Sequence, residues 1–327
     1  MTNKPDPRYR FSGIFALLIS CSAEPSTSDA TPSATKDDEV QGTFPDTLRG
    51  ACPLDRRNGS FDITVLKDYS SLGGNVASGV VPGNIPSVVM EKEGCRLLHK
   101  SNPFCDPPCQ GQQTCDLNGE CIPYPENQDA GTVKIAGLQA QVTMSPIEPG
   151  MNYFQPISTD SHPVFLEGAK ISLTSTDGYA GKMALFGVGV AALEVLDEIW
   201  TFSEGEPLAV NWTPANDPTY SRVLFDVSVD QHGSSPYRLY CDMDDTGSAL
   251  VPAELIYALL QAGVSGFPNG HLTRRTVDST QDAASCIELT ISTPIGVAVD
   301  VLGSTPCNKD SDCPTGQICD LVTHLCR

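Results

Sequence analysis

Short runs of alternating apolar and polar residues, separated by Gly, Pro, Asn or Asp, dominate the chain from residue 130 to 303. Such runs are typical of half-buried β-strands, and helical periodicity of useful length appears once or twice at most. Short strands at near-regular spacing are typical of a β-sandwich or barrel. We therefore predict a β-sandwich domain over 130–303. The runs are GTVKIAGLQAQVTM, AKISLTST, KMALFGVGV, PLAVNWTP, RVLFDVSVD, YRLYCDM and CIELTIS.

A smaller strand-rich segment covers residues 49–103. SFDITVLKD alternates like a half-buried strand, Gly-rich turns follow, and SVVM and CRLLHK indicate further strands. Cys52 and Cys95 flank the segment and have no cysteine near them. A unit of roughly fifty residues needs such a covalent link, so we predict a small β unit closed by a Cys52–Cys95 disulfide.

Two clusters of four cysteines, at 104–125 and 304–327, form an internal repeat, with a Gln two residues before the middle shared Cys and a common CDL tripeptide. Each cluster has too few apolar residues for a core, so disulfides take its place. Spacing leaves three pairings open in each cluster, and we favour first with third and second with fourth. The cysteines are Cys105, Cys109, Cys115 and Cys121 in the first module and Cys307, Cys313, Cys319 and Cys326 in the second.

The N-terminus has the pattern of a processing signal over 1–20: a basic segment and then the ten-residue apolar run FSGIFALLIS. Leu18-Ile19-Ser20-Cys21 resembles the lipobox of bacterial lipoproteins. That resemblance implies cleavage before Cys21, acylation of Cys21 and, because Ser22 follows, an outer-membrane location. An ordinary secretory signal with a coincidental cysteine is the alternative. Residues 21–48, rich in Ser, Thr, Pro and Asp, are predicted to be a flexible tether.

The number of cysteines agrees with a location outside the cytoplasm. The chain has 13 cysteines, and setting aside Cys21 for the lipid leaves an even number that can form six disulfides in an oxidising compartment. Cys241 and Cys286 lie on separate strand-like runs, and we predict that they bridge them.

Composition narrows the class of partner. Hydrophobic residues make up 40% of the chain and charged residues 18%, the balance of a folded protein. The net charge of -20 excludes the electrostatic footprint of a nucleic-acid-binding protein. We therefore expect no nucleic-acid partner, contact with a membrane through the lipid anchor, and an envelope protein or a glycan as candidate partners.

Three resemblances bear on the fold. LAVNWTPANDP followed by RVLFDVSVD is similar to the B and C strand region of fibronectin type III and other immunoglobulin-like domains, which implies that Trp212 packs between two sheets. The C-terminal module resembles the Dickkopf N-terminal cysteine-rich pattern, and both modules loosely resemble fragments of EGF-like domains. The expected fold is thus mainly β: an immunoglobulin/fibronectin-like sandwich, a smaller N-terminal β unit and two disulfide-rich modules.

Most of the mature chain resembles the cysteine-rich lipoproteins of myxobacteria and related deltaproteobacteria. The series that carries this resemblance is GCRLLHKSNPFCDPPCQGQQTCDLNGECIPYPENQDAGTVKIAGL, NWTP and CDMDDTGSALVPAEL. The resemblance implies a lipoprotein location in the cell envelope and this order of segments along the chain, but it implies no activity.

The stretch CDMDDTGSALVPAEL contains Asp245-Thr246-Gly247, the motif that holds the catalytic carboxylate of aspartic proteases. Such a site needs two carboxylates, and Asp244 stands where that family has an apolar residue. We interpret the motif as a turn, followed by a helix from Pro252 to Gly263. Arg274-Arg275 is a candidate anion site or the basic edge of a strand.

A calcium site is the other candidate in this stretch. Asp242 and Asp244 occupy positions one and three of an EF-hand-like loop, but Ala253 stands where the bidentate ligand belongs. Asp310, Asp312 and Asp320 form a second acidic group without ligand spacing. We interpret these carboxylates as solvated turns and predict no metal and no cofactor.

Motifs of known hydrolases and nucleotide-binding enzymes are absent from the sequence. We therefore expect no enzyme but a lipid-anchored extracytoplasmic surface protein with a binding or envelope-associated role. A hydrolase with its site in sandwich loops and a purely structural surface protein are the alternatives.

Overall fold

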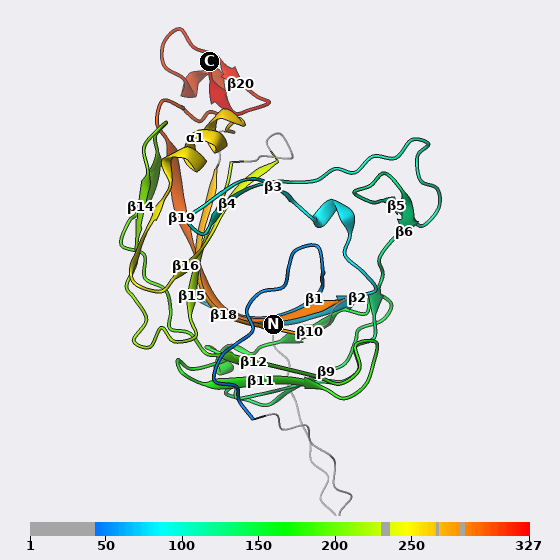
Figure 1. Ribbon diagram of the computed structural model, residues 1–327. Helices are drawn as coiled ribbons and strands as arrows, with labels where there is room; N and C mark the ends of the chain where they lie inside the picture. Colours follow the sequence, from blue (N-terminus) through cyan, green and yellow to red (C-terminus); the bar gives the residue numbers. More distant parts are fainter. Residues whose placement is uncertain (1–42, 230–235, 266–267, 281–284) are drawn as a thin grey trace, which may run out of the picture. The chain divides into compact units, whose positions relative to one another are not determined.

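The protein is described by a computed structural model that covers residues 43–229, 236–265, 268–280 and 285–327. The predicted signal, Cys21 and nearly all of the tether lie outside these residues. The described part is built from β-strands with one α-helix, α1 (Ala253–Gln261), which confirms a mainly β fold (Figure 1). No helix in these ranges is both long and apolar enough to cross a membrane.

An eleven-stranded sheet organises the molecule. Its strands follow the order β10-β2-β1-β19-β18-β15-β16-β4-β3, with β7 beside β2 and β13 beside β19. They are β1 (Arg57–Val65), β2 (Ser70–Ala77), β3 (Ser87–Lys92), β4 (Cys95–His99), β7 (Asn127–Gln128), β10 (Tyr153–Pro156), β13 (Ile199–Phe202), β15 (Arg222–Ser228), β16 (Tyr237–Asp244), β18 (Asn269–Ser279) and β19 (Cys286–Val301).

Four smaller sheets accompany it. They are β12-β11-β8-β9, β14-β17, β5-β6 and β20-β21. Their strands are β5 (Gln113–Cys115), β6 (Cys121–Pro123), β8 (Val133–Ala136), β9 (Val142–Met144), β11 (Lys170–Ser175), β12 (Met183–Val188), β14 (Leu208–Asn211), β17 (Ser248–Val251), β20 (Cys319–Asp320) and β21 (Leu325–Cys326), and the 3-10 turns are η1 (Pro82–Asn84), η2 (Thr159–Ser161) and η3 (Asp310–Asp312).

Two hydrophobic cores lie on the same face of the large sheet. In the first, Phe61 of β1 and Leu289 of β19 pack with residues of the β12-β11-β8-β9 sheet. In the second, residues of β15, β16 and β4 pack with β13, β14, β17 and α1, and Trp212 is buried there as the fibronectin resemblance implies. Because β19 supplies Leu289 to one core and Val297 to the other, this strand joins the two halves.

The strands of 49–103 do not form a separate unit. Strand β1 pairs in parallel with β19, and β4 pairs antiparallel with β16, at distant positions of the same large sheet. The alternating pattern predicted the strands themselves, because it reports which face is buried. It does not report which strand lies alongside, and these partners lie much later in the chain, at residues 237–244 and 286–301.

The two long-range disulfides differ from the predicted pairs for the same reason. Cys95 and Cys241 are direct neighbours across β4 and β16 and are bonded to each other. Cys52 is bonded to Cys286 at the start of β19. The predicted Cys52–Cys95 and Cys241–Cys286 disulfides are therefore wrong.

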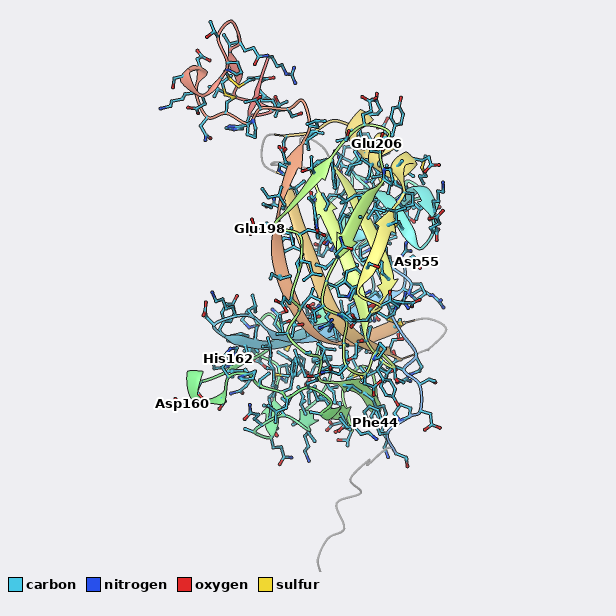
Figure 2. All side chains as sticks on the ribbon, turned by 90° about the vertical axis from the view of Figure 1, so that its left-hand side faces the viewer. Phe44, Asp55, Asp160, His162, Glu198 and Glu206 are labelled. Atoms are coloured by element: carbon cyan, nitrogen blue, oxygen red, sulfur yellow. A yellow bond between two sulfur atoms is a disulfide. The ribbon has the colours of Figure 1, made fainter. Side chains whose placement is uncertain are left out.

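The segment that leads into β1, residues 44–56, is here termed the N-terminal strap. The ring of Phe44, which is labelled in Figure 2, packs edge-on against the rings of Phe186 and Tyr220. Arg49 forms a forked ion pair with the buried Asp278, with Nε–Oδ1 and Nη2–Oδ2 distances of 2.9 and 2.8 Å. With the Cys52–Cys286 disulfide, these contacts fix the strap to the large sheet.

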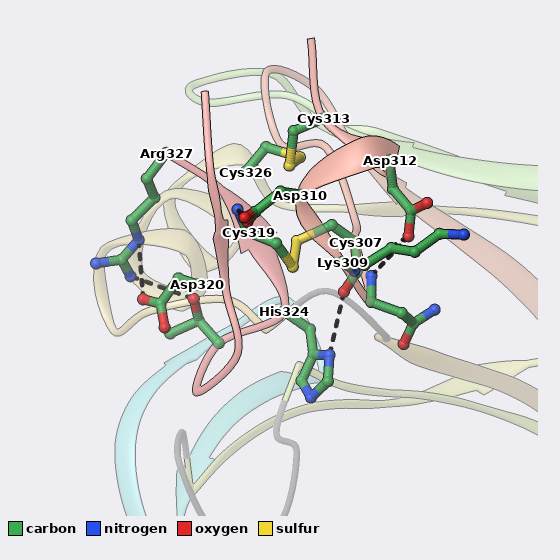
Figure 3. Close-up of a disulfide and its surroundings, with 12 residues drawn as sticks. Cys307, Lys309, Asp310, Asp312, Cys313, Cys319, Asp320, His324, Cys326 and Arg327 are labelled. Carbon is green, nitrogen blue, oxygen red and sulfur yellow. Dashed lines mark hydrogen bonds and ion pairs between the residues drawn. A yellow bond between two sulfur atoms is a disulfide. The ribbon is translucent and has the colours of Figure 1, made fainter. Parts of the chain in front are cut away.

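The cysteine modules have the pairing that we favoured. Cys105–Cys115 and Cys109–Cys121 close the first module, and Cys307–Cys319 and Cys313–Cys326 close the second (Figure 3). The shared CDL tripeptide has a structural reason. Its Asp accepts backbone N–H groups in both copies: Asp116 from Asn118 and Glu120, and Asp320 from Val322.

Helix α1 begins and ends where the sequence predicts. Pro252 precedes its first turn, Glu254 lies in that turn, and Gly263 follows its end with φ of 106°. Leu255, Ile256 and Leu259 form its buried stripe against the second core, so the segment after the Asp-Thr-Gly motif covers a sandwich end.

Candidate functional site

Asp245 of the Asp-Thr-Gly motif is buried, at 2% exposure, in a polar cluster inside the second half of the molecule. Its Oδ1 accepts hydrogen bonds from Trp212 Nε1 at 2.8 Å and Arg274 Nη2 at 3.0 Å. Its Oδ2 accepts from Ser221 Oγ at 2.8 Å and Arg274 Nε at 2.7 Å. With four donors on two oxygens, the carboxylate is saturated and has no place for a substrate or a water nucleophile.

The pKa of Asp245 reflects this cluster. Burial raises the pKa, but the hydrogen bonds from Arg274, Ser221 and Trp212 and the Arg274 charge together hold it below the ordinary value. Asp245 is thus a structural anion. Arg274 is itself only 2% exposed, which corrects the prediction of an exposed basic edge, because β18 lies between β15 and β19 inside the sheet.

The calcium candidates Asp242 and Asp244 form ion pairs with arginines. Arg222 on the neighbouring strand bonds both, with Nε–Oδ1 of 2.7 Å to Asp242 and Nη1–Oδ1 of 2.6 Å to Asp244. Arg275 Nη2 lies 3.2 Å from the second oxygen of Asp242. Two guanidinium groups thus take the positions beside these carboxylates where a cation would bind.

The second acidic group has a backbone role. Asp310 accepts the backbone N–H of Cys319, and Asp312 accepts those of Asn308 and Lys309. With Asp320 in its own turn, these carboxylates stabilise the C-terminal module.

A polar face lies on the side of the large sheet opposite the two cores. Side chains alternate along a strand, so the neighbours of the core residues point to this face. It lies on the inside of the bend that β18 and β19 make in Figure 1. Its members are Ser60, Asp62 and Thr64 of β1, Glu288, Thr290 and Ser292 of β19, Thr273 and Arg275 of β18, Arg222 and Asp226 of β15, and Arg238, Tyr240 and Asp242 of β16.

A pocket of about 990 Å³ opens on this face, and we name it the polar pocket. Strands β1, β19 and β18 form its floor, and residues around η1, β6 and β7 form further walls. Its lining combines the hydroxyls of Ser60, Tyr124, Thr273, Thr290 and Ser292, the amides of Asn58, Asn75, Asn84 and Asn127, and the charged groups of Arg57, Asp62, Glu126, Arg275 and Glu288.

Asp62 and Glu288 are the carboxyls of the pocket floor, and their strands are direct neighbours. Glu288 accepts the backbone N–H of Cys52 at 2.8 Å, and Arg57 Nη1 lies 3.7 Å from it. Burial raises the pKa of Glu288 although Arg57 opposes the shift. Desolvation likewise raises the pKa of Asp62, although Ser60 donates to it at 3.1 Å. Both carboxyls thus take up protons more readily than free ones.

Arg275 connects the pocket with the rest of the polar face. Its Nη2 donates to Tyr240 Oη at 3.0 Å and to Asp242. Its buried Nε has no partner among the described residues. Arg275 also lines a second pocket of about 570 Å³, walled by strap residues, Arg222 and Asp242, so the strap and Arg275 separate two hollows on one face.

The sequence did not identify this pocket. Ser60, Asp62 and Thr64 were visible as the polar positions of an alternating strand, but such positions normally face solvent. Ser60 and Asp62 line the pocket because β19, more than 220 residues later, pairs beside them, and this pairing leaves no signal in a single sequence.

Comparison with known proteins gives no family. No family model matches the chain, and no curated protein matches it. Among solved structures, a tri-modular GH5 subfamily 4 endo-beta-1,4-glucanase from Bacillus licheniformis matches at 10% identity and a TM-score of 0.22, covering 73% of this chain and 37% of that one. The FN1-FN3 domains of chicken CNTN1 match at 8% identity and a TM-score of 0.19, covering 69% and 70%. Likeness this low carries no conclusion about activity.

Proposed function

We propose that the protein is a lipid-anchored extracytoplasmic binding protein whose ligand, a hydroxyl-rich molecule such as a glycan, occupies the polar pocket. The lining of that pocket is the observation that carries the proposal. Hydroxylated ligands both donate and accept hydrogen bonds, and the pocket offers both kinds of group in hydroxyl, amide and carboxylate side chains. Tyr124, which lines the pocket and is 50% exposed, adds a ring on which an apolar sugar face can pack.

Binding is tested on a glycan array with the whole chain purified under oxidising conditions. We expect Asp62→Asn and Tyr124→Ala each to weaken binding roughly tenfold, because each removes one contact worth about 1.4 kcal/mol. Asp160→Asn is the control, since Asp160 is exposed on η2 (Figure 2). Equal binding by all four proteins would contradict the assignment of the pocket.

A hydrolase remains the second candidate, favoured by the two carboxyls of raised pKa in one pocket. The same incubations distinguish the two. A binding protein leaves each bound oligosaccharide intact after prolonged incubation, whereas a hydrolase releases shorter products and loses this turnover in Asp62→Asn.

The anchor is tested separately on the expressed precursor. We expect fatty-acid label on the wild type and none on Cys21→Ser, with the variant recovered in the soluble extracytoplasmic fraction, because a chain without acyl groups has no apolar anchor. Cys52→Ser is the comparison, since the structure bonds Cys52 to Cys286. A wild-type chain without label would contradict the lipoprotein assignment.

A further inference from the structure

A third hollow, of about 400 Å³, adjoins the polar pocket and has a different charge. Arg57, Lys100 and Arg238 line it, and none of the described residues of its wall carries a carboxylate. This departs from the composition of the chain, in which 40 acidic residues face 20 basic ones. We name it the basic pocket.

Nearby carboxylates offset only part of this charge. Asp226, on the neighbouring strand, forms a forked ion pair with Arg238. Glu288 lies 3.7 Å from Arg57, beyond hydrogen-bond distance. Lys100 has no ion pair among the described residues. Its backbone N–H donates a hydrogen bond to the carbonyl oxygen of Pro236. The pocket therefore keeps a cationic ammonium group and a partly neutralised pair of guanidinium groups.

The two pockets share a wall. Arg57 and Asn84 line both of them, and Asn84 belongs to the turn η1. A molecule seated in the polar pocket thus has an arginine and an amide at its border with the basic pocket. Fixed cationic groups around a small concave space favour a phosphate or carboxylate group.

We propose that the basic pocket is an anion subsite, so that the ligand is a hydroxylated molecule carrying a phosphate or carboxylate group. The ligand class rests on the proposed function, whereas the anion subsite stands on the walls of the basic pocket alone. Arg238 is held in place by Asp226, and Lys100 supplies the charge without a competing partner.

The test uses the whole chain with its disulfides intact and titrates it calorimetrically with inorganic phosphate, with acetate and with three oligosaccharides of equal length: neutral, uronic-acid and phosphorylated. We expect Lys100→Gln and Arg238→Gln each to weaken binding of the preferred anion roughly tenfold, the loss of one charge-assisted hydrogen bond. Neutral oligosaccharide binding should not change. Lys134→Gln, an exposed lysine on β8, is the control and should match the wild type.

The outcomes separate the two proposals. Anion binding that depends on Lys100 and Arg238 supports the subsite, even if no oligosaccharide binds and the proposed function fails. Oligosaccharide binding that is equal for neutral and anionic forms, with no binding of phosphate or acetate, overturns the subsite and leaves the proposed function intact. Anion binding that is equal in the wild type and all three variants also overturns it. Preference for phosphate over acetate, or the reverse, identifies the anionic group.

Discussion

Replacing Asp245 by asparagine is expected to lower the free energy of unfolding by about 3 to 5 kcal/mol, because it leaves Arg274 charged and unpaired in the interior. Chemical denaturation, followed by the fluorescence of the buried Trp200 and Trp212, measures the effect. Asp244→Asn is the control one residue away. Its carboxylate is 79% exposed and pairs with Arg222 at the surface, so a change of about 0 to 1 kcal/mol is expected.

The Asp245 effect depends on pH. Because the folded-state pKa lies below the ordinary value, the ionised carboxylate contributes stability above its unfolded-state pKa of about 3.9. That contribution is lost as the pH falls through the lower folded-state pKa. The difference between wild type and Asp245→Asn should therefore be full at neutral pH and shrink below about pH 4. A difference below about 1 kcal/mol at neutral pH would contradict a structural role for the ion pair.

Removing the Cys52–Cys286 disulfide by a double alanine substitution is expected to cost about 4 to 5 kcal/mol. The bond joins residues 234 positions apart, and long loops lose the most unfolded-state entropy when closed. We expect a lower thermal midpoint and weaker binding at the polar pocket, since Cys52 N–H holds Glu288 and Leu54 lines the pocket.

The comparison is the Cys109→Ala/Cys121→Ala variant. This disulfide spans 12 positions within one module, so its removal should disorder that module while the tryptophan transition of the second core stays near the wild-type midpoint. If both variants shift the tryptophan transition equally, the Cys52–Cys286 bond does not constrain the fold globally.

These residues show how far the sequence alone could predict the molecule. Pairing within each module was predictable because each module is short and repeated, so its cysteines have only one another as partners, but spacing left three pairings open and did not by itself select the observed one. Helix α1 was predictable because Pro252 and Gly263 mark its ends. The partner of Cys52 was not, because it depends on which strand lies beside β1. Sequence patterns report the burial of a strand but not the neighbour that buries it.

The same limit applies to the sites. The Asp-Thr-Gly motif was correctly interpreted as a turn, but Arg274, which decides the role of Asp245, lies 29 residues later and meets it only through the packing of β18. Predicting the polar pocket would have required knowing that β1 pairs with β19, because these two strands bring their polar positions together from opposite ends of the chain. Each of these sites is set by strand register.

The N-terminal strap also determines how the fold would carry a mechanical load. If the chain is tethered at Cys21, tension from the membrane first meets the Phe44 ring contacts, next the Arg49–Asp278 ion pair and then the Cys52–Cys286 bond. A covalent bond does not yield at forces that strip a strand from a sheet, so the pull passes directly into β19 and bypasses the hydrogen bonds of β1. Two residues beyond Cys286, Glu288 lies in the floor of the polar pocket. A ligand fixed to a neighbouring structure would thus be coupled to the anchor by a short path of covalent bonds.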